Sequence, residues 1–95
     1  MDINFNNVIH APIRLKICAL LSPLDEAKFR MLKEELAVSD SVLSKHIKQL
    51  EEAGYVTQSK RKSVDRQQTW VSLTQNGRNA FDSHVKALKQ LVGFN

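Results

Sequence analysis

The spacing of apolar residues predicts a first helix that begins at Pro12 and ends at Ser22. One face of this helix carries aliphatic residues at helical spacing: Ile13, Ile17, Leu20 and Leu24. Leu15, Cys18 and Ala19 point away from that face when residues are placed at steps of about 100° around the helix. We therefore expect this helix to be covered on two sides.

Two shorter amphipathic helices follow, joined by a tight turn at residues 37–39. Ser39 is a good N-cap for the second of them, and Gly54 supplies a left-handed stop at its end. The residues expected to point inward are Phe29, Leu32 and Leu36, then Leu43, Ile47 and Leu50. Two short helices joined by a short turn are typical of a helix-turn-helix, which we place at about 28–53.

Beyond Gly54 the period of the pattern changes from 3.6 to 2. Residues 55–59 and 67–73 are rich in Val, Thr, Tyr and Trp, so they predict a two-stranded hairpin at about 55–73. The polar residues 60–66 between them are expected to form its mobile tip. Most of the charges at this tip are basic.

A last helix is predicted at about 75–92, with Thr74 as its N-cap. Its apolar stripe is about 160° wide, whereas a helix with one partner needs only about 100°. This surplus, together with the second apolar face of the first helix, predicts a homodimer. The expected interface residues are Leu15, Cys18, Val85, Leu88, Leu91 and Val92.

Length and charge limit the class of protein. The chain has 95 residues, a formal net charge of +4 and a sequence pI near 9.5. We expect residues 1–95 to form a single domain, mainly α with a small β-hairpin (α+β), and its charge favours a polyanionic partner. The single cysteine, the absence of a signal peptide and the absence of a membrane-spanning run predict a soluble cytoplasmic protein that makes no membrane contact.

Three segments, "HAPIRLKICALL", "LSKHIKQLEEAGYV" and "TWVSLTQNGRNAF", give the chain a family resemblance. Over about residues 8–92 it resembles the small stand-alone winged helix-turn-helix regulators of bacteria and archaea, related to MarR-like and ArsR-like repressors. The resemblance implies a dimer that binds promoter DNA and that is held together by a long C-terminal dimerisation helix. Ala37 stands where a glycine is common in the turn, and alanine fits there if the residue needs no positive φ.

The third helix and the hairpin carry the expected DNA contacts. N-terminal residues of a groove helix lie deepest, so Ser41, Val42, Ser44 and Lys45 are assigned to base edges. Lys48 is assigned to phosphate, with Gln49 at the flank of the same face. The basic hairpin adds Lys60, Arg61, Lys62 and Arg66, which we expect along the backbone and the minor groove. The alternative is a solvated helix face beside a hairpin whose charges only prevent aggregation.

Other conspicuous residues have structural explanations. His46 is expected to be partly buried where the third helix meets the hairpin, and Trp70 to pack or contact a partner chain. Cys18 with His10 and His84 lacks a second thiol, so we expect no metal and no cofactor. The sequence leaves two partners open for Arg14: a phosphate, or an acidic residue of the core.

The leading functional hypothesis is a dimeric regulator that binds double-stranded DNA. A winged-helix module for protein interaction and an RNA-binding winged helix are the alternatives, because the fold alone does not separate them. No catalytic triad, phosphate loop or zinc-protease motif occurs, so an enzyme is not expected. No small-molecule effector is indicated; one would have to bind at the dimer interface.

Overall fold

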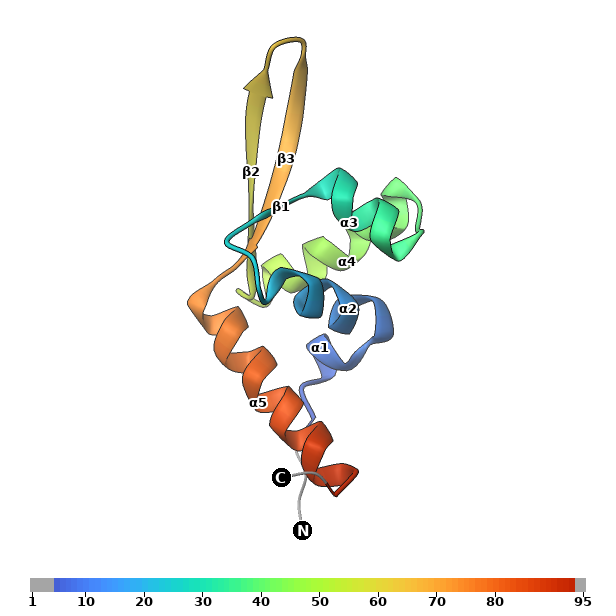
Figure 1. Cartoon of the computed structure of the whole chain (residues 1–95), viewed down its shortest axis with the longest axis vertical. Coiled ribbons are helices and arrows are strands. Elements are labelled where there is room, and N and C mark those ends of the chain that lie inside the picture. Colours follow the sequence, from blue (N-terminus) through green and yellow to red (C-terminus); the bar gives the residue numbers. More distant parts are fainter. Residues whose placement is uncertain (1–4, 94–95) are drawn as a thin grey trace.

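The computed structural model describes residues 5–93, apart from the side chain of Ser63, and has five helices and one three-stranded sheet in that range. The helices are α1 (Asn7–His10), α2 (Pro12–Leu21), α3 (Phe29–Leu36), α4 (Asp40–Glu52) and α5 (Gln75–Leu91). The strands are β1 (Ala27–Lys28), β2 (Val56–Ser63) and β3 (Arg66–Leu73). The β2–β3 hairpin extends from one end of the helices and α5 from the other (Figure 1). The expected fold class is thus confirmed.

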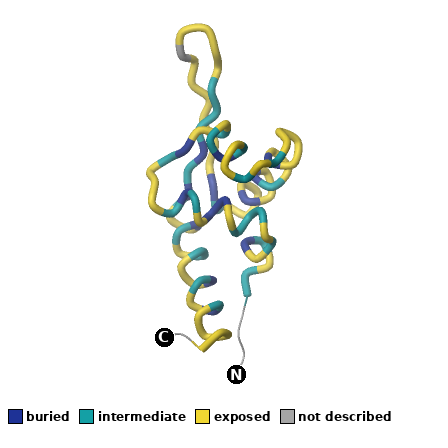
Figure 2. The backbone as a smooth tube through the Cα atoms, turned by 45° about the vertical axis from the view of Figure 1, so that its right-hand side comes forward, coloured by how far each residue is buried: buried dark blue, intermediate teal, exposed yellow. Residues whose placement is uncertain are grey.

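The core lies where α2, α3 and α4 meet the base of the hairpin (Figure 2). The inward residues predicted for α4 are all fully buried: Leu43, Ile47 and Leu50. Ile17 of α2 and Leu32 of α3 pack with them. The three inner residues of α4 hold that helix against the core, so its opposite face is left to solvent.

Cys18 does not lie on a second, free face of α2. It is 0% exposed and belongs to the core, and its burial raises the pKa of the thiol to about 11. The expectation that Cys18 contacts a partner chain is therefore wrong for this conformation. The helical wheel could not show that the core covers both sides of this part of α2. Leu15 is half-buried against the same core, and Leu24 lies beyond the end of α2 with 37% of its surface exposed.

The helix-turn-helix has the predicted limits, but its turn does not meet the condition under which an alanine at residue 37 would fit without strain. Ser39 caps α4, because its side chain accepts a hydrogen bond from the backbone N–H of Val42. Gly54 has a φ of +81°, as expected for a left-handed stop. Ala37 also lies in the left-handed region, with a φ of 54°, so this turn does need a positive φ. An alanine there is strained by about 1 kcal/mol relative to glycine.

The sheet is larger than the sequence indicated. The strand β1 pairs antiparallel with β3 and makes the order β1-β3-β2, with Ala27 opposite Val71 and Lys28 opposite Trp70. A strand of two residues is too short to give a periodic signal, so it was not predicted. β1 joins the N-terminal end of α3 directly to the hairpin.

The basic residues of the hairpin are not in a loose tip. Lys60, Arg61 and Lys62 belong to β2 and pair with residues 67–69 of β3, and Arg66 begins β3. The turn itself consists of Val64 and Asp65, and Val64 has a φ of 50°. The expectation that residues 60–66 form a tip outside the strands is therefore wrong, because backbone pairing across the hairpin extends the strands beyond their apolar pattern.

The start of α5 explains the "LTQNGR" segment. Thr74 caps the helix through the backbone N–H of Gly77, as predicted. A Cβ atom at Gly77 would lie 2.0 Å from the carbonyl oxygen of Tyr55, so only glycine fits there. Arg78 donates to the carbonyl oxygens of Ser22 and Leu24, each at 2.9 Å. These contacts fix α5 against the end of α2.

The short helix α1 was not predicted. Asn6 caps it, and the Asn6 backbone N–H donates to Nδ1 of His84 on α5 at 3.1 Å. The N-terminal segment is thereby joined to α5, although the two lie at opposite ends of the chain. In residues 5–93 no helix combines the length and the apolar character needed to cross a membrane.

Candidate nucleic-acid interface

The outer face of α4 is exposed along its whole length. Every residue of α4 that was assigned to DNA lies on this face: Ser41, Val42, Ser44, Lys45, Lys48 and Gln49. Val42 is 39% exposed, so its aliphatic side chain is open to solvent on this face. At the N-terminal end, Asp40 is ion-paired with Lys33 of α3 at 2.9 Å. The helix thus presents short polar and cationic side chains in a fixed orientation.

Gln49 is held by a residue of α2. Its side-chain oxygen accepts a hydrogen bond from Arg14, which also contacts Nδ1 of His46 at 3.1 Å and the carbonyl oxygen of Val8. In the described part of the chain Arg14 bonds to neutral groups and to no acidic residue, while its contact with a phosphate stays a prediction. His46 is partly buried as expected, and its ring contacts Arg14. Burial, followed by the charges of Arg14 and Lys45, lowers the pKa of His46.

The cationic residues of the hairpin are all exposed, and they lie on its two faces. Side chains alternate along a strand, so Lys60 and Lys62 share the face of buried Val56, while Arg61 lies on the other. Arg66 shares the face of Arg61, because Arg66 and Trp70 are four residues apart on β3 and Trp70 lies under Arg61. The hairpin can therefore present positive charge in two directions.

Arg61 is engaged by the body of the protein. Its guanidinium is ion-paired with Glu26, in the loop before β1, and lies 4.8 Å above the ring centre of Trp70. The hydrogen bond to Glu26 raises the pKa of Arg61. Lys28 lies over the same ring at 5.4 Å. Trp70 is half-buried and serves as a platform for two cations, a role that sequence reasoning missed because Lys28 and Arg61 are far apart in the chain.

A depression between α4 and the hairpin brings the two predicted regions together. It has a volume of about 310 Å³, and its lining includes Ser44 of α4 and Lys60 of β2. Phe29, Asp40, Gln58 and Thr69 complete it. An exposed helix and a basic strand that border one depression can contact one rod-shaped polyanion at the same time.

The residues assigned to a dimer interface differ in exposure. Leu91 and Val92, at the end of α5, are 58% and 63% exposed, whereas Val85 and Leu88 are half-buried. Among the described residues of α5 and its C-terminal cap, Leu91 and Val92 are the two aliphatic side chains that are more than half exposed.

His10 and His84 are bonded to each other, with 3.1 Å between Nδ1 and Nε2, while Cys18 lies in the core. Over the described range 5–93, no three side chains of His, Cys, Asp or Glu are grouped closely enough to hold a metal ion. The two histidines instead connect α1 to α5.

Comparison with known proteins gives several matches. A family model described as a winged helix DNA-binding domain matches residues 13–92. An uncharacterized protein of Methanocaldococcus jannaschii is 37% identical over 84 residues, which are 88% of this chain and 91% of that protein. An uncharacterized HTH-type transcriptional regulator of Bacillus subtilis, YdgJ, is 34% identical over 79 residues, and the chain spans about half (48%) of its length. The solved structure of a transcriptional regulator homologue from Pyrococcus horikoshii OT3 is similar with a TM-score of 0.87 and 28% identity, covering 93% of this chain and 87% of that one.

Proposed function

The chain belongs to the family of winged helix DNA-binding domains found in transcriptional regulators, and we propose that it binds double-stranded DNA as a homodimer. In this proposal α4 lies in the major groove, and the β2–β3 hairpin lies on the backbone and the adjacent minor groove. The resemblance to MarR-like regulators is confirmed, and this family is not enzymatic. We further propose that residues 1–95 act as one domain in the cytoplasm.

The observation that carries this proposal is the depression shared by Ser44 and Lys60. It joins the exposed face of α4 to the basic hairpin, so one duplex can meet both. A major groove about 12 Å wide admits a helix, and a β-ribbon beside that helix can follow the backbone. A protein-interaction module would instead expose a continuous apolar patch on this face. Val42 is the one aliphatic side chain among the six assigned residues of α4.

Within this arrangement each side chain has a proposed role. Ser41, Val42, Ser44 and Lys45 lie on the N-terminal half of α4 and are proposed to read base edges, with Lys48 on a phosphate. The side-chain oxygen of Gln49 accepts a hydrogen bond from Arg14, so the amide nitrogen of Gln49 is the group left to donate to DNA. Arg14 thereby sets the orientation of Gln49.

The dimer is proposed to form through the end of α5, where Leu91 and Val92 are exposed. A two-fold dimer would place its two groove helices about 34 to 36 Å apart, or a multiple of that distance, and would require a pseudo-palindromic site. One subunit alone would make too few phosphate contacts to bind tightly at physiological salt.

Selection of bound fragments from a random duplex library tests the function. We expect a pseudo-palindromic motif, and we expect Lys45→Ala to cost about 1 to 3 kcal/mol on that motif and little on random duplex. Lys86→Ala, at an exposed position of α5, is the matched control and should cost little on both. No enrichment, or equal affinity for duplex RNA at the same salt concentration, would contradict the proposal.

A further inference from the structure

A second depression lies beside the first half of β3, between that strand and the first turn of α3. Its volume is about 280 Å³. It is lined by Lys28, Phe29 and Arg30 from one side and by residues 66–69 from the other, beginning with Arg66. Only Arg66 of these was assigned to DNA from the sequence, because Lys28 and Arg30 are brought to the hairpin by the unpredicted strand β1.

The depression exists because β1 is short. On this edge of β3, β1 pairs only with Trp70 and Val71, so residues 66–69 have no neighbouring strand there. Their free edge faces the N-terminal end of α3, where Lys28 is the N-cap residue and no side chain accepts from the first N–H groups. Both walls therefore offer backbone donors in addition to their side chains.

The lining has one sign of charge. Lys28, Arg30 and Arg66 are exposed cations, and Gln67, Gln68 and Thr69 add neutral polar groups. Among the described residues that line this depression, none is acidic. Glu34 lies one turn along α3 and bonds to Arg30 at 3.2 Å, but both side chains are about 70% exposed (72% and 68%), so an anion can compete for Arg30.

The two depressions are adjacent. Phe29 and Thr69 line both of them, so they form opposite sides of one saddle. One side leads to Ser44 and Lys60, and the other leads to Lys28, Arg30 and Arg66. A nucleic-acid strand that passes Ser44 and Lys60 would next meet these three cations.

We propose that a backbone phosphate of the bound DNA occupies the cleft between β3 and α3, held by Lys28, Arg30 and Arg66. This rests on the proposed function. The ligand chemistry is that of a phosphate group, for which Arg supplies a fork of donors and Lys a point charge. The cleft extends the interface beyond α4 and the hairpin to the start of α3, and Lys28 and Arg30 act as positioning contacts that carry no base information.

Salt dependence of duplex binding tests the assignment. Fluorescence anisotropy would measure the binding constant of a selected duplex over a range of NaCl concentrations. We expect the double variant Lys28→Gln, Arg30→Gln to reduce the slope of log K against log salt concentration by about 0.9 for each phosphate contact removed. The single variant Arg30→Lys keeps the charge at this position, so it should retain the part of the slope that Arg30 contributes.

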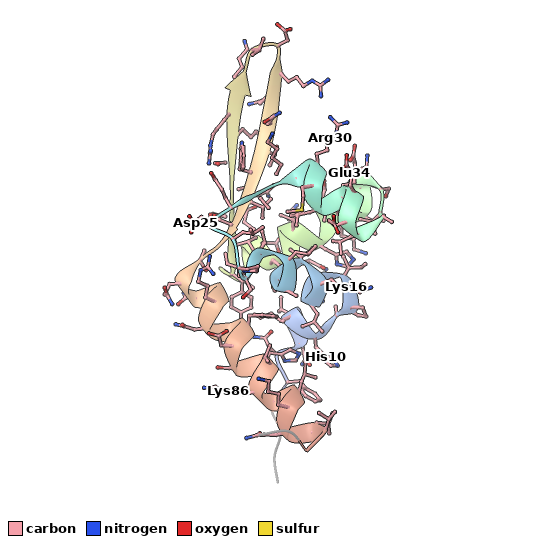
Figure 3. All side chains as sticks on the ribbon, viewed as in Figure 1. His10, Lys16, Asp25, Arg30, Glu34 and Lys86 are labelled. Carbon is pink, nitrogen blue, oxygen red and sulfur yellow. The ribbon has the colours of Figure 1, made fainter. Side chains whose placement is uncertain are left out.

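Lys16 and Lys86 provide the matched control. They are exposed lysines on α2 and α5, and Figure 3 shows them away from the end of α3 that carries Arg30. The double variant Lys16→Gln, Lys86→Gln removes the same charge, and we expect it to leave the slope nearly unchanged. Circular dichroism of all variants checks that the fold is retained. Equal slopes for the two double variants would overturn the assignment of a phosphate to the cleft, while the proposed function would stand.

A free anion is the other source of a phosphate group. Inorganic pyrophosphate titrated against the protein alone, followed by amide NMR shifts of residues 28–30 and 66–69, separates the two. We expect only weak, salt-sensitive shifts, because one isolated group lacks the rest of the DNA contacts. Saturation below millimolar concentration would reassign the cleft to a small anionic ligand and overturn the proposal. Failure of the wild-type protein to bind any duplex would contradict the proposed function itself.

Discussion

The Nδ1 atom of His10 lies 3.1 Å from the Nε2 atom of His84. Because Nδ1 of His84 already accepts from the Asn6 backbone N–H, its Nε2 must carry the proton and donate to His10. The imidazole of His84 is therefore neutral in this arrangement. Phe5 stacks on the His10 ring at 4.8 Å and closes the site, where His84 is 1% exposed. A proton added to Nδ1 of His84 would place two N–H groups, that of the ring and that of Asn6, against each other.

We predict that acid weakens the fold through this pair. Burial, and then the neighbouring His10, lowers the pKa of His84 below its ordinary value of 6.5, so the unfolded chain takes up the proton more readily. The stabilisation is complete above about pH 6.5 and is lost as the pH falls through the lower folded-state value. Each unit by which the pKa of His84 is lowered should reduce the free energy of unfolding by about 1.4 kcal/mol between pH 7.5 and pH 5. Urea unfolding at one protein concentration would measure this change.

Two variants separate the contributions to this pH dependence. His84→Gln should lower stability at pH 7.5 and make the remaining pH dependence shallower. His46→Gln is the control, because the pKa of His46 is also lowered but its ring bonds to Arg14 instead. If the stability of His84→Gln depends on pH as strongly as that of the wild-type protein, the histidine pair is not the source of this dependence.

Ala37→Gly should stabilise the protein. Ala37 has a φ of 54°, where a Cβ atom clashes and glycine does not, so we expect a gain of up to about 1 kcal/mol, reduced by the greater freedom of glycine in the unfolded chain. Thermal unfolding would measure it. Ala53→Gly is the matched control, since Ala53 is exposed and right-handed at the end of α4 and should lose stability. A loss at both positions would mean that the turn relaxes around alanine without cost.

The ion pair between Glu26 and Arg61 should oppose DNA binding. A phosphate has to replace Glu26, so Glu26→Gln is expected to strengthen binding to all duplexes at low salt by at most about fivefold, because exposed ion pairs are weak. Asp82→Asn, on exposed α5, removes the same charge away from the hairpin. Weaker binding by Glu26→Gln would mean that Glu26 orients Arg61 instead of competing for it.

The end of α5 should control assembly. Leu91→Asp with Val92→Asp places charge on two side chains that are more than half exposed, so the subunit should stay folded while the dimer dissociates. Light scattering would measure the mass, and a gel-shift titration should give an affinity near that for a half site. Asn79→Asp with Gln90→Asp adds the same charge at exposed polar positions of α5 and should leave the dimer intact. A monomeric wild-type protein that binds full and half sites equally would refute this model.

Local sequence patterns determined the main elements and the candidate face of α4. Leu43, Ile47 and Leu50 at helical spacing, with Ser39 before them and Gly54 after, define where α4 begins, ends and faces, because each signal acts within a few residues. The Thr74 cap does the same for α5. These signals need no knowledge of the rest of the chain.

Tertiary structure decided what those elements contact. Cys18 could be placed in the core only once both sides of α2 had neighbours. Arg14 with Gln49, and Glu26 with Arg61, are each joined across 35 residues, and His10 with His84 across 74. Such pairs carry no periodic signal, because side chains distant in sequence meet only when helices and strands pack. The short strand β1 likewise takes its conformation from pairing with β3, and that pairing alone brings Lys28 and Arg30 beside the hairpin.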